Sequence, residues 1–249
     1  MLHASSTAAV IGFAASLSDV APDGVSHLVA KGMLNATRRS SLTDPEPLTP
    51  GEVYELQIEI DTTAWVFPTG HRIRLAIASA DWPNVWPTPQ PATNTVHRGN
   101  ARPSRLIVPT VPPQGSATPP QYRPSSRAMV RHSDRTERPS WQVVHDVLVG
   151  RSQVRIREAS DERINDTTAV RREYSLVADC DPYEPSSASA HGRHLSRIAR
   201  PNSVIEGSSD VLIQATATHF NVTIDLVLRV NGTIHHSNRW VEAVPRLLL

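Results

Sequence analysis

The chain has 249 residues, of which 39% are hydrophobic and 20% charged, and its formal net charge is +1. This length suits one large β-domain or two modest domains, and no run approaches the roughly 18 consecutive apolar residues of a membrane span, so we expect a soluble protein. The near-zero charge argues against nucleic-acid binding, and the single cysteine, Cys180, excludes an internal disulfide framework and a cysteine-based zinc site.

The N-terminal region has the period of a strand. Residues 1–16 are rich in small and apolar side chains, but no lysine or arginine precedes Lys31, so no export signal is predicted and a cytoplasmic location is expected. Apolar residues then occupy every second position over 11–17, which predicts a strand already inside a sheet. We therefore expect the chain to begin in the middle of a fold.

Turn signals separate the next elements. Asp19-Val20-Ala21-Pro22-Asp23-Gly24 predicts a turn, because proline fixes φ and Asp-Gly is a favoured turn pair. A strand over 26–34 and a proline-containing loop over 43–51 follow. Residues 52–61 have the clearest strand pattern of the chain, because apolar residues alternate with acidic and polar ones.

Pro68-Thr69-Gly70 predicts a turn into a second clear strand over 71–79, whose polar face carries arginines. If 52–61 and 71–79 are neighbours, acidic and arginine side chains would form cross-strand pairs worth roughly 0.2–1 kcal/mol each. Short strands are also predicted over 93–97 and 105–108. No helical stretch interrupts this half of the chain, so we predict an all-β fold.

Composition divides the chain into three parts. Residues 1–112 are predicted to form a jelly-roll β-domain, and residues 113–139 a Pro/Ser/Arg-rich linker or surface loop. Residues 140–249 are predicted to form a second antiparallel β-region. The predicted fold is therefore an antiparallel jelly-roll β-sandwich followed by a second antiparallel β-region.

Within the last part, strands are predicted from their alternating or β-branched sequences. They cover residues 141–149, 153–157, 170–178, 204–205, 211–218, 220–230 and 233–242. Asn231-Gly232 separates the last two of them and is a strong hairpin signal. The Ser/Ala/His/Arg-rich block over 181–202 is assigned no structure.

Motifs for the common catalytic chemistries are missing from the sequence. A serine hydrolase of the α/β type needs Gly-x-Ser-x-Gly, and Gly24-Val25-Ser26-His27-Leu28 lacks the second glycine and follows a β-turn. There is no phosphate-binding Gly-x-x-x-x-Gly-Lys, no His-Glu-x-x-His and no Gly-x-Gly-x-x-Gly before a helix. We therefore assign no catalytic residue, no cofactor and no metal ligand.

The histidine pairs and the tryptophan loop have simple alternative explanations. His235 and His236 are adjacent, so on a strand they point to opposite faces and cannot easily share a metal ion. Trp82 and Trp86 lie in a proline-rich loop and could form a platform for carbohydrate. The alternative is a loop anchored by two buried indoles, or docked on a partner domain.

Several strings, taken in order, resemble one family. They are Leu17-Ser18-Asp19-Val20-Ala21-Pro22-Asp23-Gly24, Asp61-Thr62-Thr63-Ala64-Trp65-Val66-Phe67, Gly70-His71-Arg72-Ile73-Arg74-Leu75, the Trp82-Pro83 and Trp86-Pro87 loop, His219-Phe220, and the closing Trp240-Val241-Glu242-Ala243-Val244-Pro245-Arg246. Together they resemble the C-terminal non-catalytic domain of the X-Pro dipeptidyl-peptidase and cocaine esterase (CocE/NonD) hydrolases. Each string is weak alone, but their order makes the combination specific.

The resemblance implies a jelly-roll, galactose-binding-like β-domain that packs against an α/β-hydrolase domain in full-length members. Those members are serine hydrolases of esters or amides, and their Ser, Asp and His triad belongs to the α/β domain. The present sequence matches none of the triad, and the first strands of the jelly roll are expected to be missing. The catalytic domain is the implied partner, in cis in full-length relatives and in trans here; homo-oligomers are a further expectation.

Two hypotheses follow from these observations. In the first, the chain is an accessory domain of an acyl esterase or dipeptidyl-peptidase, and Asp19, Asp23, Trp82 and Trp86 are candidates for contact with the catalytic domain. In the second, it is an autonomous β-sandwich module that binds carbohydrate or another ligand through the tryptophan loop.

Overall fold

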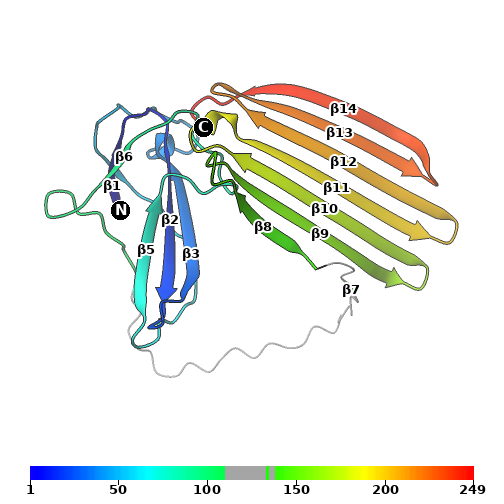
Figure 1. Ribbon diagram of the computed structural model, residues 1–249, viewed down its shortest axis with the longest axis horizontal. Helices are drawn as coiled ribbons and strands as arrows, with labels where there is room; N and C mark the ends of the chain where they lie inside the picture. The colour runs from blue at the N-terminus through cyan, green and yellow to red at the C-terminus, as the bar shows by residue number, and fades with distance from the viewer. Residues whose placement is uncertain (110–132, 135–137) are drawn as a thin grey trace.

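A computed structural model describes residues 1–109, 133–134 and 138–249, and every sheet in it is antiparallel. Figure 1 shows two small sheets on one side and one large sheet on the other. The predicted all-β, antiparallel fold is therefore confirmed. The predicted linker over 113–139 lies largely outside the described residues. No helix in the described part of the chain is long and apolar enough to cross a membrane.

Two three-stranded sheets form the N-terminal unit. The first has the order β4-β1-β6 and the second β3-β2-β5. Their bounds are β1 Leu2–Ser6, β2 Gly12–Val20, β3 Ser26–Asn35, β4 Tyr54–Leu56, β5 Arg72–Ala78 and β6 Asn94–His97. A 3-10 helix, η1 (Ala36–Arg38), follows β3, and Asn35 caps it by accepting a hydrogen bond from the backbone N–H of Thr37.

The core of this unit lies between the two small sheets. Leu2, Ala4 and Leu56 contribute from one sheet and Phe13 from the other, and all four are at most 4% exposed. Gly32 of β3 is buried where the chain from Glu59 to Asp61 passes close to it, and the Asp61 N–H donates to the Lys31 carbonyl at 2.8 Å. The unit is thus a β-sandwich with one shared hydrophobic core.

The large sheet is a meander in which each of the last six strands pairs with its sequence neighbour (Figure 1). Its strands are β7 Ser133–Asp134, β8 Ser140–His145, β9 Ser152–Asn165, β10 Thr168–Cys180, β11 Ser189–Arg200, β12 Ser203–Ala215, β13 His219–Val230 and β14 Thr233–Pro245, with a 3-10 helix, η2 (Pro185–Ser187), before β11. The predicted hairpin at Asn231-Gly232 is confirmed: both residues have positive φ, at 50° and 82°, as a tight two-residue turn requires.

Several predicted elements differ from the structure. The strand predicted over 52–61 is wrong beyond Leu56, because the chain leaves β1 there and crosses β3. It is also not a neighbour of β5, which pairs with β2. No strand forms over 105–108, and the strand predicted over 141–149 ends at His145.

The block over 181–202 was predicted to lack structure, and this is wrong, because β11 spans Ser189–Arg200. Strands β10 and β12 pair with β11 along its whole length and satisfy its backbone N–H and C=O groups. Serine, histidine and arginine are tolerated here because the residues of β11 are only partly covered. Pairing partners, not intrinsic preference, therefore decide this strand.

Candidate functional site

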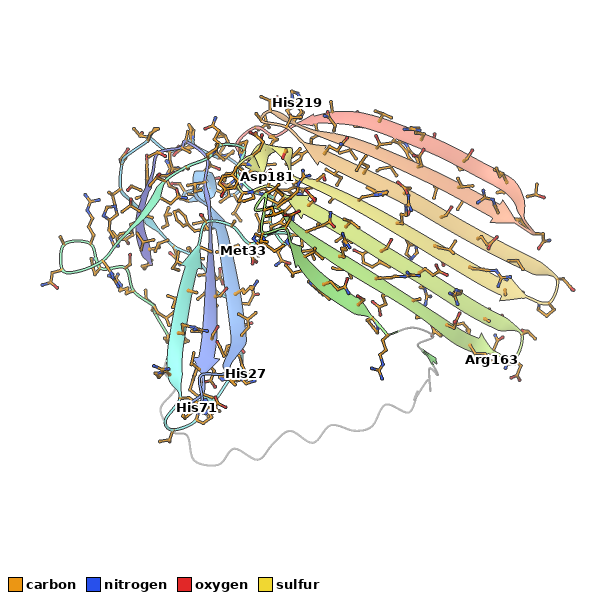
Figure 2. All side chains as sticks on the ribbon, in the orientation of Figure 1. His27, Met33, His71, Arg163, Asp181 and His219 are labelled. Carbon is orange, nitrogen blue, oxygen red and sulfur yellow. The ribbon has the colours of Figure 1, made fainter. Side chains whose placement is uncertain are left out.

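Asp19 lies at the centre of a polar cluster near the end of β2. The Trp65 indole Nε1 donates to Asp19 Oδ2 at 3.0 Å, and His71 Nδ1 lies 2.8 Å from Asp19 Oδ1. The Asp19 side chain is 3% exposed and that of His71 23%. Figure 2 shows His71 and His27 together at this end of the small sheet, far from His219. Both Asp19 carboxylate oxygens are thus hydrogen-bonded out of solvent.

Two adjacent turns build this end of the sheet. Gly24 has φ +90° and its N–H donates to the Ala21 carbonyl, while the Val25 N–H donates to Asp23 Oδ1. In the second turn Gly70 has φ +87°, and Pro22 lies 3.8 Å from the position of its absent Cβ. Asp23 therefore stabilises the first turn and is itself exposed.

The charge of Asp19 is stabilised by its neighbours. Burial alone would raise the pKa of this carboxyl, but hydrogen bonds from His71 and Trp65 and the positive charges of His71 and His27 outweigh it, so the pKa lies below its ordinary value. A carboxyl group with a lowered pKa contributes stability that is present above its ordinary pKa and is lost as the pH falls through the lowered value. Asp19 therefore favours the folded state at neutral pH.

Apolar residues that neighbour the cluster in sequence or by strand pairing are exposed to solvent. Val66 is 84% exposed, Ile73 57%, Val25 50% and Trp65 44%. Trp65 belongs to both groups, because its indole N–H is bound to Asp19 while much of its surface is accessible. We call Val25, Trp65, Val66 and Ile73 the turn-end patch.

Trp82 and Trp86 lie elsewhere, at the junction with the large sheet. Their rings form an edge-to-face pair with centroids 4.9 Å apart, and Trp86 packs on Phe220 of β13 at 5.1 Å. The Arg246 guanidinium lies 4.7 Å from the Phe220 ring centroid. Both indoles are partly buried, and the Trp82 Nε1 is buried without a hydrogen-bond partner among the described residues. This is the arrangement of an anchored loop. The contacts of the two indole rings with each other and with Phe220 occupy ring surface on which a carbohydrate would have to stack.

Arg246 holds this junction together. It is 1% exposed, and its Nη2 donates to the Pro87 carbonyl at 2.6 Å while its Nη1 donates to the Thr216 carbonyl at 3.2 Å. Burial lowers the pKa of this guanidinium from its ordinary value. The C-terminal tail continues the contact, because the Leu248 carbonyl accepts hydrogen bonds from Asn35 and Thr37. The C-terminal tail therefore fastens the large sheet to the N-terminal unit.

The four predicted contact residues thus fall into two separate clusters. Asp19 and Asp23 share one end of the small sheet, and Trp82 and Trp86 share the junction; no hydrogen bond, ion pair or ring contact within the described ranges joins the two pairs. Whether they touch another domain stays a prediction. Sequence reasoning did not single out the partners His71, Phe220 and Arg246, although all three lie in strings that carried the family resemblance.

Histidine–serine and histidine–carboxylate pairs remain separate in the described part of the chain. His97 Nε2 lies 3.1 Å from Ser5 Oγ and His145 Nδ1 lies 3.0 Å from Ser152 Oγ, without a carboxylate on either ring. The histidines paired with carboxylates are His3, His71 and His191, and no serine hydroxyl bonds to their rings. A nucleophilic triad needs all three groups in one hydrogen-bonded series, which these pairs do not supply.

A shallow hollow on the large sheet is lined by charged groups that pair with each other. Asp210 accepts from Arg193 Nε at 2.6 Å and lies 2.8 Å from His191 Nε2. Partial burial raises the pKa of Asp210, but these two hydrogen bonds and charges outweigh it and leave the pKa below its ordinary value. The charged groups around the hollow therefore form surface ion pairs with each other. Within the described residues, no group of histidine, cysteine and carboxylate side chains could hold a metal ion.

Comparison with known proteins matches one family model and three esterases. Residues 1–139 match the family described as X-Pro dipeptidyl-peptidase C-terminal non-catalytic domain. A cocaine esterase of Rhodococcus sp. is 31% identical over 124 residues, which is 44% of this chain and 22% of the esterase. Two proteins named "Putative serine esterase", from Mycobacterium bovis and Mycobacterium tuberculosis, are 32% identical over 130 residues, 45% of this chain and 21% of theirs. The chain thus spans about a fifth of the length of these relatives.

Proposed function

We propose, from the premise that this chain belongs to the family of X-Pro dipeptidyl-peptidase C-terminal non-catalytic domains, that it supports the catalytic domain of a serine hydrolase acting on esters or amides. The family's description calls this domain non-catalytic, which places the catalytic residues of such enzymes in another domain. The matched relatives are esterases by name, and about four fifths of their length lies outside the match. The catalytic domain lies in the same polypeptide in such relatives, and we propose that here it is joined in cis or associates in trans.

The turn-end patch is the observation that carries this proposal. Val66 and Ile73 stay more than half exposed, although Val66 follows Trp65 and Ile73 pairs with Asp19, and both Trp65 and Asp19 belong to the hydrogen-bonded cluster. Apolar surface on a rigid support is typical of a docking surface. We therefore propose that the catalytic domain packs on this patch, with Asp19 holding Trp65 in place from below.

The test is co-expression of the full chain with the α/β catalytic domain of a family relative. We expect co-purification of a complex and a higher unfolding temperature of the catalytic domain. The variants Val66→Asp and Ile73→Asp should weaken the complex at least about tenfold, because a charge would be buried in an apolar contact. Leu42→Asp is the matched control, since Leu42 is 77% exposed but lies outside the patch. No complex, or equal loss in the control, would refute the proposal.

A further inference from the structure

Strand β5 is an open edge of the N-terminal unit. It pairs with β2 along its whole length, from Arg72 opposite Val20 to Ala78 opposite Ala14. Apart from this pairing, no backbone hydrogen bond joins residues 72–78 to the described part of the chain. Figure 1 shows β5 as the outer strand of its sheet, on the side away from the large sheet. The backbone N–H and C=O groups that point outward from β5 can therefore pair with another strand.

The side chains of β5 form two chemically different rows. Ile73, Leu75 and Ile77 lie on one face of the sheet, and Arg72 and Arg74 lie on the other. Ile73 is 57% and Leu75 37% exposed, whereas Ile77 packs against the core. A strand placed beside β5 therefore meets an apolar row on one face and a basic row on the other.

The basic row lacks a carboxylate partner. The β2 and β3 side chains that share its face are alanine, serine, valine, leucine, methionine and Lys31, and Lys31 is paired with Asp81. Arg74 Nη2 donates to Ser26 Oγ at 2.6 Å, but this hydroxyl does not neutralise the charge of the guanidinium. Within the described residues, the Arg72 side chain makes no hydrogen bond or ion pair and is exposed. The two arginines thus leave positive charge beside the open edge.

We infer that β5 accepts a further strand at this edge, an extended segment with apolar side chains on one face and carboxylates on the other. That this segment belongs to the polypeptide carrying the catalytic domain rests on the proposed function. Main-chain hydrogen bonds supply the affinity, and the two rows select the segment, because directly opposite side chains on neighbouring strands interact. Ile73 also belongs to the turn-end patch, so the added strand continues the surface on which the catalytic domain is proposed to pack.

A second copy of β5 fits this edge less well than an acidic segment. When a two-fold axis relates two antiparallel strands in one sheet, like faces lie together, so the arginines of both copies share a face. Full-length pairing sets Arg74 opposite Ala76, and the two Arg74 side chains then lie diagonally across the pair. Like charges so close oppose pairing, whereas carboxylates opposite the arginines form ion pairs.

Two synthetic peptides of about nine residues, within the usual length of a strand, test this inference on the full chain. One alternates valine with glutamate and the other valine with lysine. In fluorescence anisotropy, the glutamate peptide should bind at least about tenfold more tightly, because ion pairs replace repulsions. Arg72→Glu combined with Arg74→Glu should reverse this preference, and reversal rather than loss also shows that the variant is folded. Arg98→Glu combined with Arg102→Glu is the matched control, since both arginines are exposed in the loop after β6, and it should keep the preference.

Hydrogen exchange, followed for each amide by NMR, separates strand addition from docking through side chains alone. The glutamate peptide should slow exchange at alternate amides of β5, those that point outward, and leave the amides of β14, the outer strand of the large sheet, unchanged. Failure of the glutamate peptide to bind, equal binding of both peptides, or binding without protection of β5 would overturn the inference. Protection of β5 in the chain alone, together with a dimer mass in light scattering, would assign the edge to a second copy and overturn it too. The peptides contain no catalytic domain, so these outcomes are separate from the co-purification that tests the proposed function.

Discussion

Replacing Gly32 by alanine tests how closely the chain crosses the small sheet. A Cβ added at Gly32 would lie 2.0 Å from the Glu59 carbonyl oxygen, 2.8 Å from the Glu59 carbonyl carbon and 2.9 Å from the Ile60 Cα. All three neighbours are backbone atoms, and Cβ atoms keep at least 3.0 Å from other heavy atoms, so the crossing segment must move by about 1 Å. That movement stretches the hydrogen bond from Asp61 to Lys31.

Overpacking of this kind costs about 1–3 kcal/mol, and for a chain of this size 1 kcal/mol lowers the unfolding midpoint by roughly 2–4 °C. We therefore expect Gly32→Ala to lower the midpoint by about 3–10 °C, measured by circular dichroism. Gly12→Ala is the matched control, because its nearest neighbour would be the Leu34 carbonyl oxygen at 3.8 Å. If Gly32→Ala is as stable as Gly12→Ala, the segment after β4 does not cross β3 and the described sandwich is wrong.

Three further predictions concern single side chains. Asp19→Asn should lower the unfolding temperature at pH 7, and the variant should lose less stability than the parent chain below about pH 4, because the parent loses the contribution of Asp19 with its lowered pKa there. Thermal unfolding at a series of pH values measures both effects. An Asp23→Asn control that loses equally little stability below about pH 4 would contradict the prediction. Arg246→Met should lower the free energy of unfolding in urea by about 2–4 kcal/mol, because two hydrogen bonds from a charged donor are lost. Arg239→Met is the control, because the Arg239 side chain is 65% exposed, and it should change that free energy by less than about 0.5 kcal/mol. Equal effects of the two substitutions would refute the role of Arg246 at the junction. Burial, with the negative charges of Asp179 and Asp181 on either side, raises the pKa of the Cys180 thiol, so at pH 8 it should react with a disulfide reagent more slowly than free cysteine does. A rate equal to that of free cysteine would be inconsistent with this environment.

Local patterns predicted the strands whose two faces differ. Residues 71–79 alternate clearly and residues 26–34 follow a strong turn signal, and β5 and β3 form there within a residue or two. Asn231-Gly232 placed the last hairpin because few residue pairs accept positive φ at both positions. The signal failed where a partner strand was decisive: residues 52–61 alternate as regularly as β5, yet the chain leaves its sheet after Leu56 to pass Gly32.

The candidate site was predictable only in part. Asp19, Trp82 and Trp86 were singled out, but their partners are distant in sequence: His71 is 52 residues from Asp19, and Arg246 is 159 residues from Pro87. Motif spacing in a single sequence does not indicate which residues so far apart in the chain come into contact. The contacts of Asp210 with His191 and Arg193 across the large sheet were likewise hidden, because the register between strands decides which positions align.

The most direct test of the account is intact-mass spectrometry of the full chain after incubation with a fluorophosphonate, which attaches covalently to an activated serine. We propose that the chemistry belongs to a catalytic domain outside these residues, so the mass should remain that of the unmodified chain. Stoichiometric addition of one phosphonyl group to a serine of this chain would contradict it.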